Sequence, residues 1–186
     1  PYGERSLEEL RELARGVTRF MLAQGAKLIV IACNTASAAA LKALRQENPG
    51  VPFVGMEPAV KPAAEQTNSG KVGVLATPST FQGELYASVV ERFASGVEIY
   101  QETCPGLVSQ IEQGRLETPK TRRILETALL PLMARGVDTL VMGCTHFPFI
   151  IPLIEQITEG KACVIDPAPA VARQTLRVLE ERGLLN

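Results

Sequence analysis

Two cysteines stand at matching positions in two similar stretches of this sequence. Residues 25–35 (GAKLIVIACNT) align without gaps with residues 136–146 (GVDTLVMGCTH), and each stretch runs from a glycine through an apolar run to a cysteine, Cys33 or Cys144. A single cysteine after an apolar strand is usually a small packing residue, but two in the same place of an internal repeat are hard to explain that way. We expect the two repeated units to face each other and to present both thiols to one cleft.

A pair of thiols facing one cleft is suited to moving a proton across a carbon atom. Inverting a stereocentre requires a base on one face of the carbon and an acid on the other, so one sulfur must be a thiolate while the other is a thiol. A free thiol has a pKa of about 8.5. We expect the helix starts at Asn34-Thr35 and Thr145-His146 to lower the pKa of both thiols, because backbone N–H groups and the helix dipole favour anions there. The same N–H groups are suited to hold substrate carboxylates.

Few other ionisable side chains are placed to assist. The single histidine, His146, comes two residues after the second cysteine, and we expect it to act as a proton shuttle or as a cationic neighbour of that thiol. Glu57, Glu112 and Asp166 are carboxylates that could orient or activate a thiol. Spacing alone does not rank these three.

Composition and cysteine spacing exclude several classes of protein. The formal net charge is −1 with no run of Lys and Arg, which argues against nucleic acid or a membrane surface as partner. No apolar stretch is long enough to span a membrane and no leader opens the chain, so we expect a cytoplasmic protein with a small-molecule substrate. The cysteines form no C-x-x-C pair, so we expect free thiols and no metal, with Cys104 and Cys163 as ordinary packing residues. No G-x-G-x-x-G follows a strand, which argues against a dinucleotide-dependent dehydrogenase.

Apolar runs and helical periodicities alternate along the chain. A capping box at residues 6–9 opens an amphipathic helix that ends near Gly25. Further strands are predicted at 28–31, 53–54, 72–76, 97–100, 140–142 and 164–165, and further helices at 35–47 and 79–93, twice after Pro105 (the second from Thr118-Pro119), after Pro148, and after the cap Asp166-Pro167. This alternation is typical of an α/β doubly wound fold with parallel sheets, whose ligands bind beyond the carboxyl ends of the strands. We expect strand 28–31 to be buried on both faces.

Residues 31–37 (IACNTAS) and 142–148 (MGCTHFP) together resemble the paired signatures of glutamate racemases in the aspartate/glutamate racemase superfamily. Residues 1–3 (PYG) and 76–80 (ATPST) are also similar to that family's substrate-contacting segments. The resemblance implies cofactor-independent interconversion of L- and D-glutamate, supplying the D-isomer for peptidoglycan. Cys33 would take the proton from D-glutamate and Cys144 from L-glutamate, with His146 assisting Cys144. The implied substrate contacts are Tyr2, Gly3, Asn34, Thr35, Thr77, Thr80 and Thr145.

The same resemblance implies two similar doubly wound α/β domains with parallel-sheet cores and the active site between them. We place the first domain at 1–57 plus 166–186 and the second at 58–165. The family's auxiliary glutamate falls at Glu112, with Gln113 where another acidic residue is expected. Family members begin with a strand that ends in Asp-Ser-Gly, whose Asp partners the first thiol. We expect this chain to start after that segment and to need it for completion. A homodimer is expected from the resemblance alone.

Three alternatives stay open at the level of sequence. The substrate could be aspartate or another amino acid, since sequence does not measure the depth of a pocket. One cysteine could act alone as a nucleophile with His146 as its base, although this leaves the internal repeat unexplained. The chain could also be an inactive fragment that only binds an acidic metabolite. Exchange of the substrate α-proton with solvent distinguishes a racemase, whatever its substrate, from a single-nucleophile enzyme and from a binding fragment.

Overall fold

The computed structural model of the chain describes residues 2 and 5–185, and among these the strands form two parallel sheets. The strands are β1 (Ile29–Val30), β2 (Phe53–Val54), β3 (Lys71–Leu75), β4 (Glu98–Glu102), β5 (Thr139–Met142) and β6 (Cys163–Ile165). The helices are α1 (Leu7–Ala23), α2 (Asn34–Glu47), α3 (Val60–Gln66), α4 (Pro78–Phe81), α5 (Glu84–Phe93), α6 (Leu107–Glu112), α7 (Pro119–Ala134), the 3₁₀ helix η1 (Phe147–Ile150), α8 (Ile151–Ile157) and α9 (Ala168–Glu181). The α/β fold with parallel sheets that the sequence predicted is confirmed. No helix among the described residues is both long and apolar enough to span a membrane.

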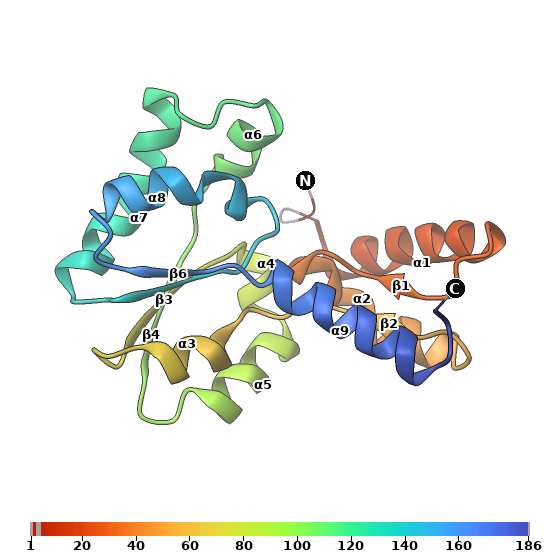
Figure 1. Ribbon diagram of the computed structural model, residues 1–186. Coiled ribbons are helices and arrows are strands. Elements are labelled where there is room, and N and C mark those ends of the chain that lie inside the picture. Colours follow the sequence, from red (N-terminus) through yellow and green to blue (C-terminus); the bar gives the residue numbers. More distant parts are fainter. Residues whose placement is uncertain (1, 3–4, 186) are drawn as a thin grey trace.

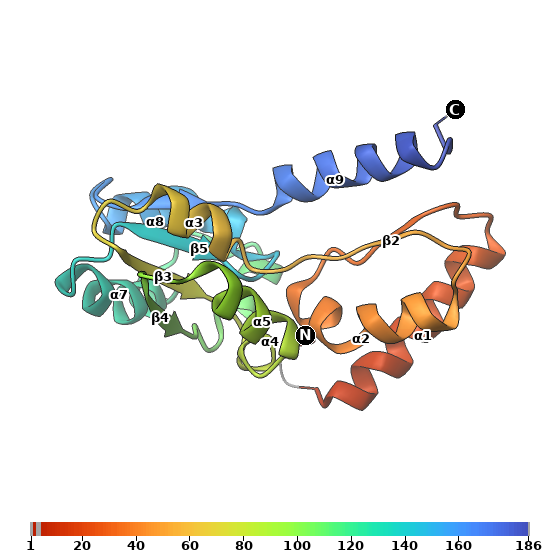
Figure 2. The same ribbon diagram turned by 90° about the horizontal axis from the view of Figure 1, so that it is seen from below.

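Each sheet forms the centre of one lobe (Figure 1). In the first lobe, α1 and α2 cover one face of the β1-β2 sheet and α9 lies along the other face (Figure 2). In the second lobe the strand order is β4-β3-β5-β6, with α3 and α5 on one face and α6, α7 and α8 on the other. The chain enters the second lobe after β2 and returns to the first for α9. We propose that the domain boundaries expected from the sequence, 1–57 plus 166–186 and 58–165, follow this division.

The first helix forms where the sequence predicted it. The Ser6 hydroxyl accepts the N–H of Glu9 at 3.3 Å, and the Glu9 carboxylate accepts the N–H of Ser6 at 2.9 Å, which completes the expected capping box. Leu10 and Leu44 are buried between α1 and α2. The Arg15 guanidinium donates to the Glu47 carboxylate at 2.8 Å and joins the same two helices at their surface. The two helices are therefore held by both packing and ion pairing.

Two predicted helices differ from the structure, and one helix of the structure was not predicted. The helix expected over 79–93 is divided into α4 and α5. Gly83 is the N-cap of α5, and an added Cβ there would lie 2.7 Å from the Ala38 Cβ. The helix expected after Pro148 starts as the 3₁₀ turn η1, since two prolines, Pro148 and Pro152, each remove a backbone N–H that an α-helix would use. Helix α3 was not predicted, because its seven residues are too few to display a clear helical period.

The second lobe contains the larger core, and two of its strands nearly touch at their carboxyl ends. Strands β3 and β5 are almost entirely buried. Gly143 follows β5, and a Cβ added there would lie 2.8 Å from the Ala76 Cβ and 2.9 Å from the Leu75 carbonyl oxygen. Only glycine allows this approach. It fixes the position of the next residue, Cys144, relative to the end of β3.

The first lobe is more open. Strand β1 has two residues, and the Val30 side chain is 39% exposed, so the expectation of a strand buried on both faces is wrong. Helix α9, which covers that face, has no buried residue. A gap lies between the sheet and the helix, and its lining includes Val30 of β1, Met56 and several residues of α9. The sheet therefore has one packed face and one face that is only loosely covered.

Candidate active site

A pocket of about 230 Å³ lies where the two lobes meet, at the carboxyl ends of the strands. This is where a doubly wound fold places its ligands. Five residues that the sequence predicted line it, and these are Tyr2, Cys33, Thr35, Thr77 and His146. The lining also includes residues that were not predicted, among them Thr103, Cys104, Pro105, Gly106, Val108, Ser109 and Phe147.

Cys33 enters the pocket from the first lobe, directly after β1. Its backbone is extended, with φ −154° and ψ 123°, and it is the N-cap of α2. The sulfur accepts the backbone N–H of Ala36 at 3.5 Å, so the thiol satisfies one of the free donors of the helix end. The predicted position at the start of a helix is confirmed. Such a helix end also favours a bound anion.

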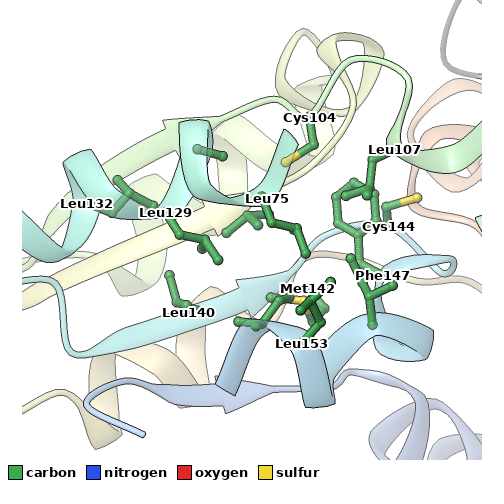
Figure 3. Close-up of a cluster of buried hydrophobic side chains, with 14 of the residues drawn as sticks. Leu75, Cys104, Leu107, Leu129, Leu132, Leu140, Met142, Cys144, Phe147 and Leu153 are labelled. Carbon is green, nitrogen blue, oxygen red and sulfur yellow. The ribbon is translucent and has the colours of Figure 1, made fainter. Parts of the chain in front are cut away.

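Cys144 follows β5 and is buried, with 8% of its surface exposed. Its sulfur lies at the edge of the main apolar cluster, beside Leu107 and Phe147 (Figure 3). Burial raises the pKa of the Cys144 thiol to about 11, although the backbone N–H groups of His146 and Phe147 act in the opposite direction. The charge of Cys33 also acts to raise the pKa of the Cys144 thiol. The expectation that the helix start would lower the pKa is therefore wrong for Cys144, because loss of hydration outweighs the backbone donors.

A chain of polar contacts leads from Cys144 toward the surface. The Cys144 sulfur lies 3.8 Å from Nδ1 of His146, and Nε2 of the same ring lies 2.5 Å from the Glu112 carboxylate on α6. The Glu112 side chain is 62% exposed and the His146 side chain 32%. Next to Glu112, the Gln113 amide donates to the Ser109 hydroxyl at 3.2 Å. Of the three carboxylates that the sequence left open, Glu112 is thus the one joined to a thiol through the histidine.

Three threonine hydroxyls form a closed ring between the lobes. The Thr35 oxygen, at the start of α2, lies 2.8 Å from that of Thr77 and 3.1 Å from that of Thr80. The Thr77 and Thr80 oxygens, from α4 and the residue before it, are also 3.1 Å apart. Thr35 and Thr80 are buried, while Thr77 opens to the pocket. The ring joins three predicted contact residues, of which Thr35 and Thr77 line the pocket.

Asn34, beside Cys33, carries a buried amide without a partner. The residue is 1% exposed, and neither its Oδ1 nor its Nδ2 makes a hydrogen bond within the described part of the chain. Leaving a buried amide unsatisfied costs about 1–3 kcal/mol per group. The amide is therefore a place where a further donor and acceptor would be stabilising.

Other predicted residues lie elsewhere. Thr145 lines the gap between α9 and the β1-β2 sheet rather than the pocket. Gly3 falls outside the described residues. Asp166 accepts the N–H of Ala168 at 2.8 Å at the start of α9, which confirms the predicted cap, and Glu57 is exposed. Neither of these two carboxylates lines the pocket.

The loop after β4 is the main part of the pocket that the sequence analysis missed. The strand was predicted to end at Tyr100, but β4 continues to Glu102, so Thr103 and Cys104 occupy a third strand end. Cys104 is buried, and burial raises the pKa of its thiol to about 12. It belongs to the same apolar cluster as Cys144 (Figure 3). A strand placed two residues longer would have pointed to this loop.

The fold thus has two α/β lobes with a pocket between them. Cys33 of the first lobe lines this pocket, and Cys144 of the second lobe lies beside His146, which also lines it. The chain belongs to the Asp/Glu/Hydantoin racemase family, whose sequence model matches residues 2–175. This family membership places the chain among the isomerases that act on amino acids.

Several proteins similar to this chain are named glutamate racemase. A glutamate racemase from Roseiflexus sp. (strain RS-1) is 50% identical over 185 residues, which span all of this chain and 68% of that protein. The crystal structure of a Francisella tularensis glutamate racemase in complex with D-glutamate is 30% identical, with a TM-score of 0.84, and the match covers 100% of this chain and 69% of that one. An Escherichia coli glutamate racemase, solved with L-glutamate and the activator UDP-MurNAc-ala, is 34% identical with a TM-score of 0.86, and the match covers 97% and 68%.

Proposed function

We propose that this chain interconverts L- and D-glutamate by passing a proton between Cys33, Cys144 and the α-carbon. The observation that carries this function is the thiol pair of the internal repeat. Cys33 lines the pocket between the lobes, and the Cys144 sulfur lies 3.8 Å from Nδ1 of His146, which lines the same pocket. The names of the relatives support glutamate as substrate, and crystals of two similar proteins hold its D- and L-forms.

Cys144 is the proton donor of the pair when D-glutamate reacts. With a pKa of about 11, this thiol is neutral near pH 7 and can donate. When D-glutamate binds, the Cys33 thiolate removes the α-proton, an S–H bond forms as the C–H bond breaks, and Cys144 gives its proton to the opposite face of the carbon. The product is L-glutamate, with the thiolate now on Cys144. Reaction in the other direction uses the same steps in reverse order.

His146 and Glu112 act as positioning and proton-relay groups for Cys144. Because Cys144 is buried, its proton needs a path to solvent, and the His146 ring lies between the sulfur and the exposed Glu112 carboxylate. Glu112 fixes the orientation of the ring through its contact with Nε2. This pair can therefore remove the proton from Cys144 before L-glutamate reacts, and restore it afterwards.

The substrate carboxylates would be held by uncharged donors. Among the described residues that line the pocket there is no Lys or Arg. The donors at hand are the hydroxyls of Thr35, Thr77 and Thr80, the Asn34 amide, and the backbone N–H groups at the start of α2. Tyr2 lines the same pocket. A homodimer and a cytoplasmic location, expected from the sequence, stay predictions.

Proton exchange in deuterated water tests this function. Each enantiomer of glutamate and aspartate is incubated with the chain, and deuterium at the α-position is followed by proton NMR while circular dichroism follows racemisation. We expect exchange and racemisation with both glutamate enantiomers and little with aspartate. Cys33→Ser and Cys144→Ser should each lower turnover by about 10³-fold or more, the scale of a lost acid or base.

The matched control is Cys163→Ser, which removes an exposed thiol far from the pocket and should leave turnover unchanged. A covalent adduct on one cysteine without α-deuterium would instead favour a single nucleophile. Unchanged glutamate binding with no exchange in the unaltered chain would identify a binding module.

A further inference from the structure

We propose that a second pocket, beside the loop 103–106, binds a small anion that carries an apolar group. The pocket has a volume of about 490 Å³ and lies between the end of β4 and helix α7. It shares Thr103 and Pro105 with the active-site pocket, but its other walls are different. Binding at this place does not depend on the proposed function.

Two cations on α7 give the second pocket its charge. Lys120 and Arg123 both line it, and they are three positions apart, so they lie on the same face of the helix. Neither of these side chains forms an ion pair or a hydrogen bond with the rest of the described chain, residues 2 and 5–185. The pocket therefore offers two cationic groups that no described side chain uses.

Arg122, which lies between these two residues in the sequence, has partners of its own. Its guanidinium donates to the side-chain oxygen of Gln156 at 3.0 Å and lies 3.8 Å from the Glu126 carboxylate. The acidic residue of the second pocket is Glu102, and within the described part of the chain it lies outside ion-pair distance of both cations. Two cations and one carboxylate give the described lining a formal charge of +1. A bound anion would balance this charge.

The stability of α7 does not account for the position of Lys120. The helix begins after its N-cap Thr118, and its first turn contains Lys120 but no acidic residue. The start of a helix carries partial positive charge, so a cation is unfavourable there and an acidic group is favourable. An anion held by Lys120 and Arg123 would offset this repulsion.

Apolar side chains form much of the remaining wall. Ile124 and Ala128 come from α7, and Pro105 comes from the loop. Ala128 is buried, and Ile124 packs against the main apolar cluster of the second lobe. A purely apolar ligand would remove water from the two cations without replacing it, whereas an inorganic ion would leave the apolar wall without a contact. A ligand that joins an anionic group to an apolar group satisfies both parts.

The loop connects the second pocket to the active site. Gly106 has a φ of 80°, and the N–H of Leu107 donates to the Cys104 carbonyl at 3.1 Å, so the loop makes a tight turn. The Ile124 side chain lies beside this turn, 3.9 Å from the place of a Cβ added at Gly106. A ligand in contact with Ile124 and Pro105 would therefore restrict a loop that also lines the active-site pocket. The expected result, slower turnover, rests on the proposed function.

Titration with phenyl phosphate tests the inference, because this probe joins an anionic group to an apolar ring. Amide chemical shifts of the isotope-labelled full chain give both the affinity and the location of binding. We expect saturable binding at one to one, with the largest shifts at residues 103–106 and 120–128. Inorganic phosphate should bind at least about tenfold more weakly, because it makes no contact with the apolar wall.

Two variants of α7 make the test specific. Arg123→Gln removes a cation of the second pocket and should weaken phenyl phosphate binding at least about tenfold. The matched control is Arg122→Gln, which removes the same charge from a side chain that contacts Gln156 instead, and it should bind like the unaltered chain. At saturating glutamate, phenyl phosphate should lower kcat of the unaltered chain about twofold or more and have no effect on that of Arg123→Gln.

Four results would overturn the inference. They are no saturable binding, shifts confined to the start of α2 in the active-site pocket, equal affinity of the two variants, and inorganic phosphate that binds as tightly as phenyl phosphate. Binding as expected without any effect on kcat would contradict the link through the loop. Binding as expected in a chain that racemises no amino acid would leave the inference standing and count against the proposed function alone.

Discussion

The two lobes use the same device, a cysteine directly after an apolar strand, in two different surroundings. In the first lobe, Cys33 is partly exposed and caps a long α-helix beside a two-stranded sheet. In the second lobe, Cys144 is buried at the end of a strand in a four-stranded sheet and is followed by a 3₁₀ turn. The comparison teaches that a repeated motif fixes where a thiol lies, while packing around it decides its protonation.

Truncation of a buried side chain should show the largest difference between the two lobes, because the loss of unfolding free energy depends on how tightly each lobe is packed. Leu129 on α7 is fully buried in the second lobe, and Leu129→Ala should lower the free energy of unfolding by about 2–5 kcal/mol because it leaves a cavity. Val30→Ala in the first lobe should cost less than about 0.5 kcal/mol, because the side chain is already largely exposed. Urea unfolding followed by circular dichroism measures both. Equal losses would mean that the first lobe is packed as tightly as the second.

The two thiols should differ in their reaction with iodoacetamide. The pKa of Cys144 is raised from 9.0 to about 11, so below pH 9 its thiolate fraction should be about a hundredfold smaller than that of an ordinary thiol. We expect its alkylation rate to rise about tenfold per pH unit until the pH approaches this pKa. Peptide mass spectrometry resolves each cysteine, with the exposed Cys163 as reference. A plateau for Cys144 near the plateau of Cys163 would contradict the role given to burial.

The relay exists only in the second lobe, and its loss should slow the reaction rather than weaken binding. Glu112→Gln removes the carboxylate that faces His146 and should lower kcat about tenfold with little change in KM, since the pair acts through the second thiol. Glu117→Gln changes another exposed carboxylate nearby and serves as control. A raised KM at constant kcat would instead assign Glu112 to substrate binding.

The smallest effect concerns the opposite end of the second sheet. Burial acts to raise the pKa of Asp138, but hydrogen bonds from the Thr67 hydroxyl and from the N–H groups of Ser69 and Asn68 outweigh it and lower the pKa to about 2. Asp138→Asn should destabilise the fold by about 1 kcal/mol at pH 7, a value reduced for partial exposure.

The lowered pKa of Asp138 determines how its contribution to folding stability changes with pH. A lowered pKa means that the carboxylate stabilises the fold above its unfolded pKa of about 4, and that this stabilisation is lost as the pH falls toward 2. The difference in urea midpoint between Asp138→Asn and the unaltered chain should therefore shrink over this range. A difference that stays constant with pH would show that the carboxylate charge is not involved.

Much of this organisation could be predicted from local patterns. The capping box of α1, the alternation of strands and helices, and the strand-end position of both cysteines all follow from residues that are close in sequence. The interruption between α4 and α5 at Gly83 was not predicted, and the closeness of Gly83 to Ala38 in the other lobe is not visible in the local sequence. The length of β4 was also misjudged, since Gln101 and Glu102 are polar and belong to the strand only through pairing with β3.

The protonation of Cys144 is the clearest limit of the sequence. The local pattern, a thiol before backbone N–H groups, indicated a lowered pKa. The opposite result comes from apolar residues such as Leu107 and Phe147, which pack around the sulfur once the whole lobe has folded. The joining of Glu112 to His146 has the same origin, because 34 positions separate them in the chain.

The threonine ring between the lobes has a consequence for ligand entry. Each threonine hydroxyl can donate one hydrogen bond, so the three contacts of the triangle use the hydrogens of all three hydroxyls. An arriving carboxylate can receive a hydrogen from Thr35, Thr77 or Thr80 only if a side of the triangle opens. Opening one side of the triangle also removes a hydrogen bond that holds this group of threonines together. Ligand binding in the pocket and movement of the two lobes relative to each other are therefore coupled, because the three hydroxyls have only three hydrogens to donate.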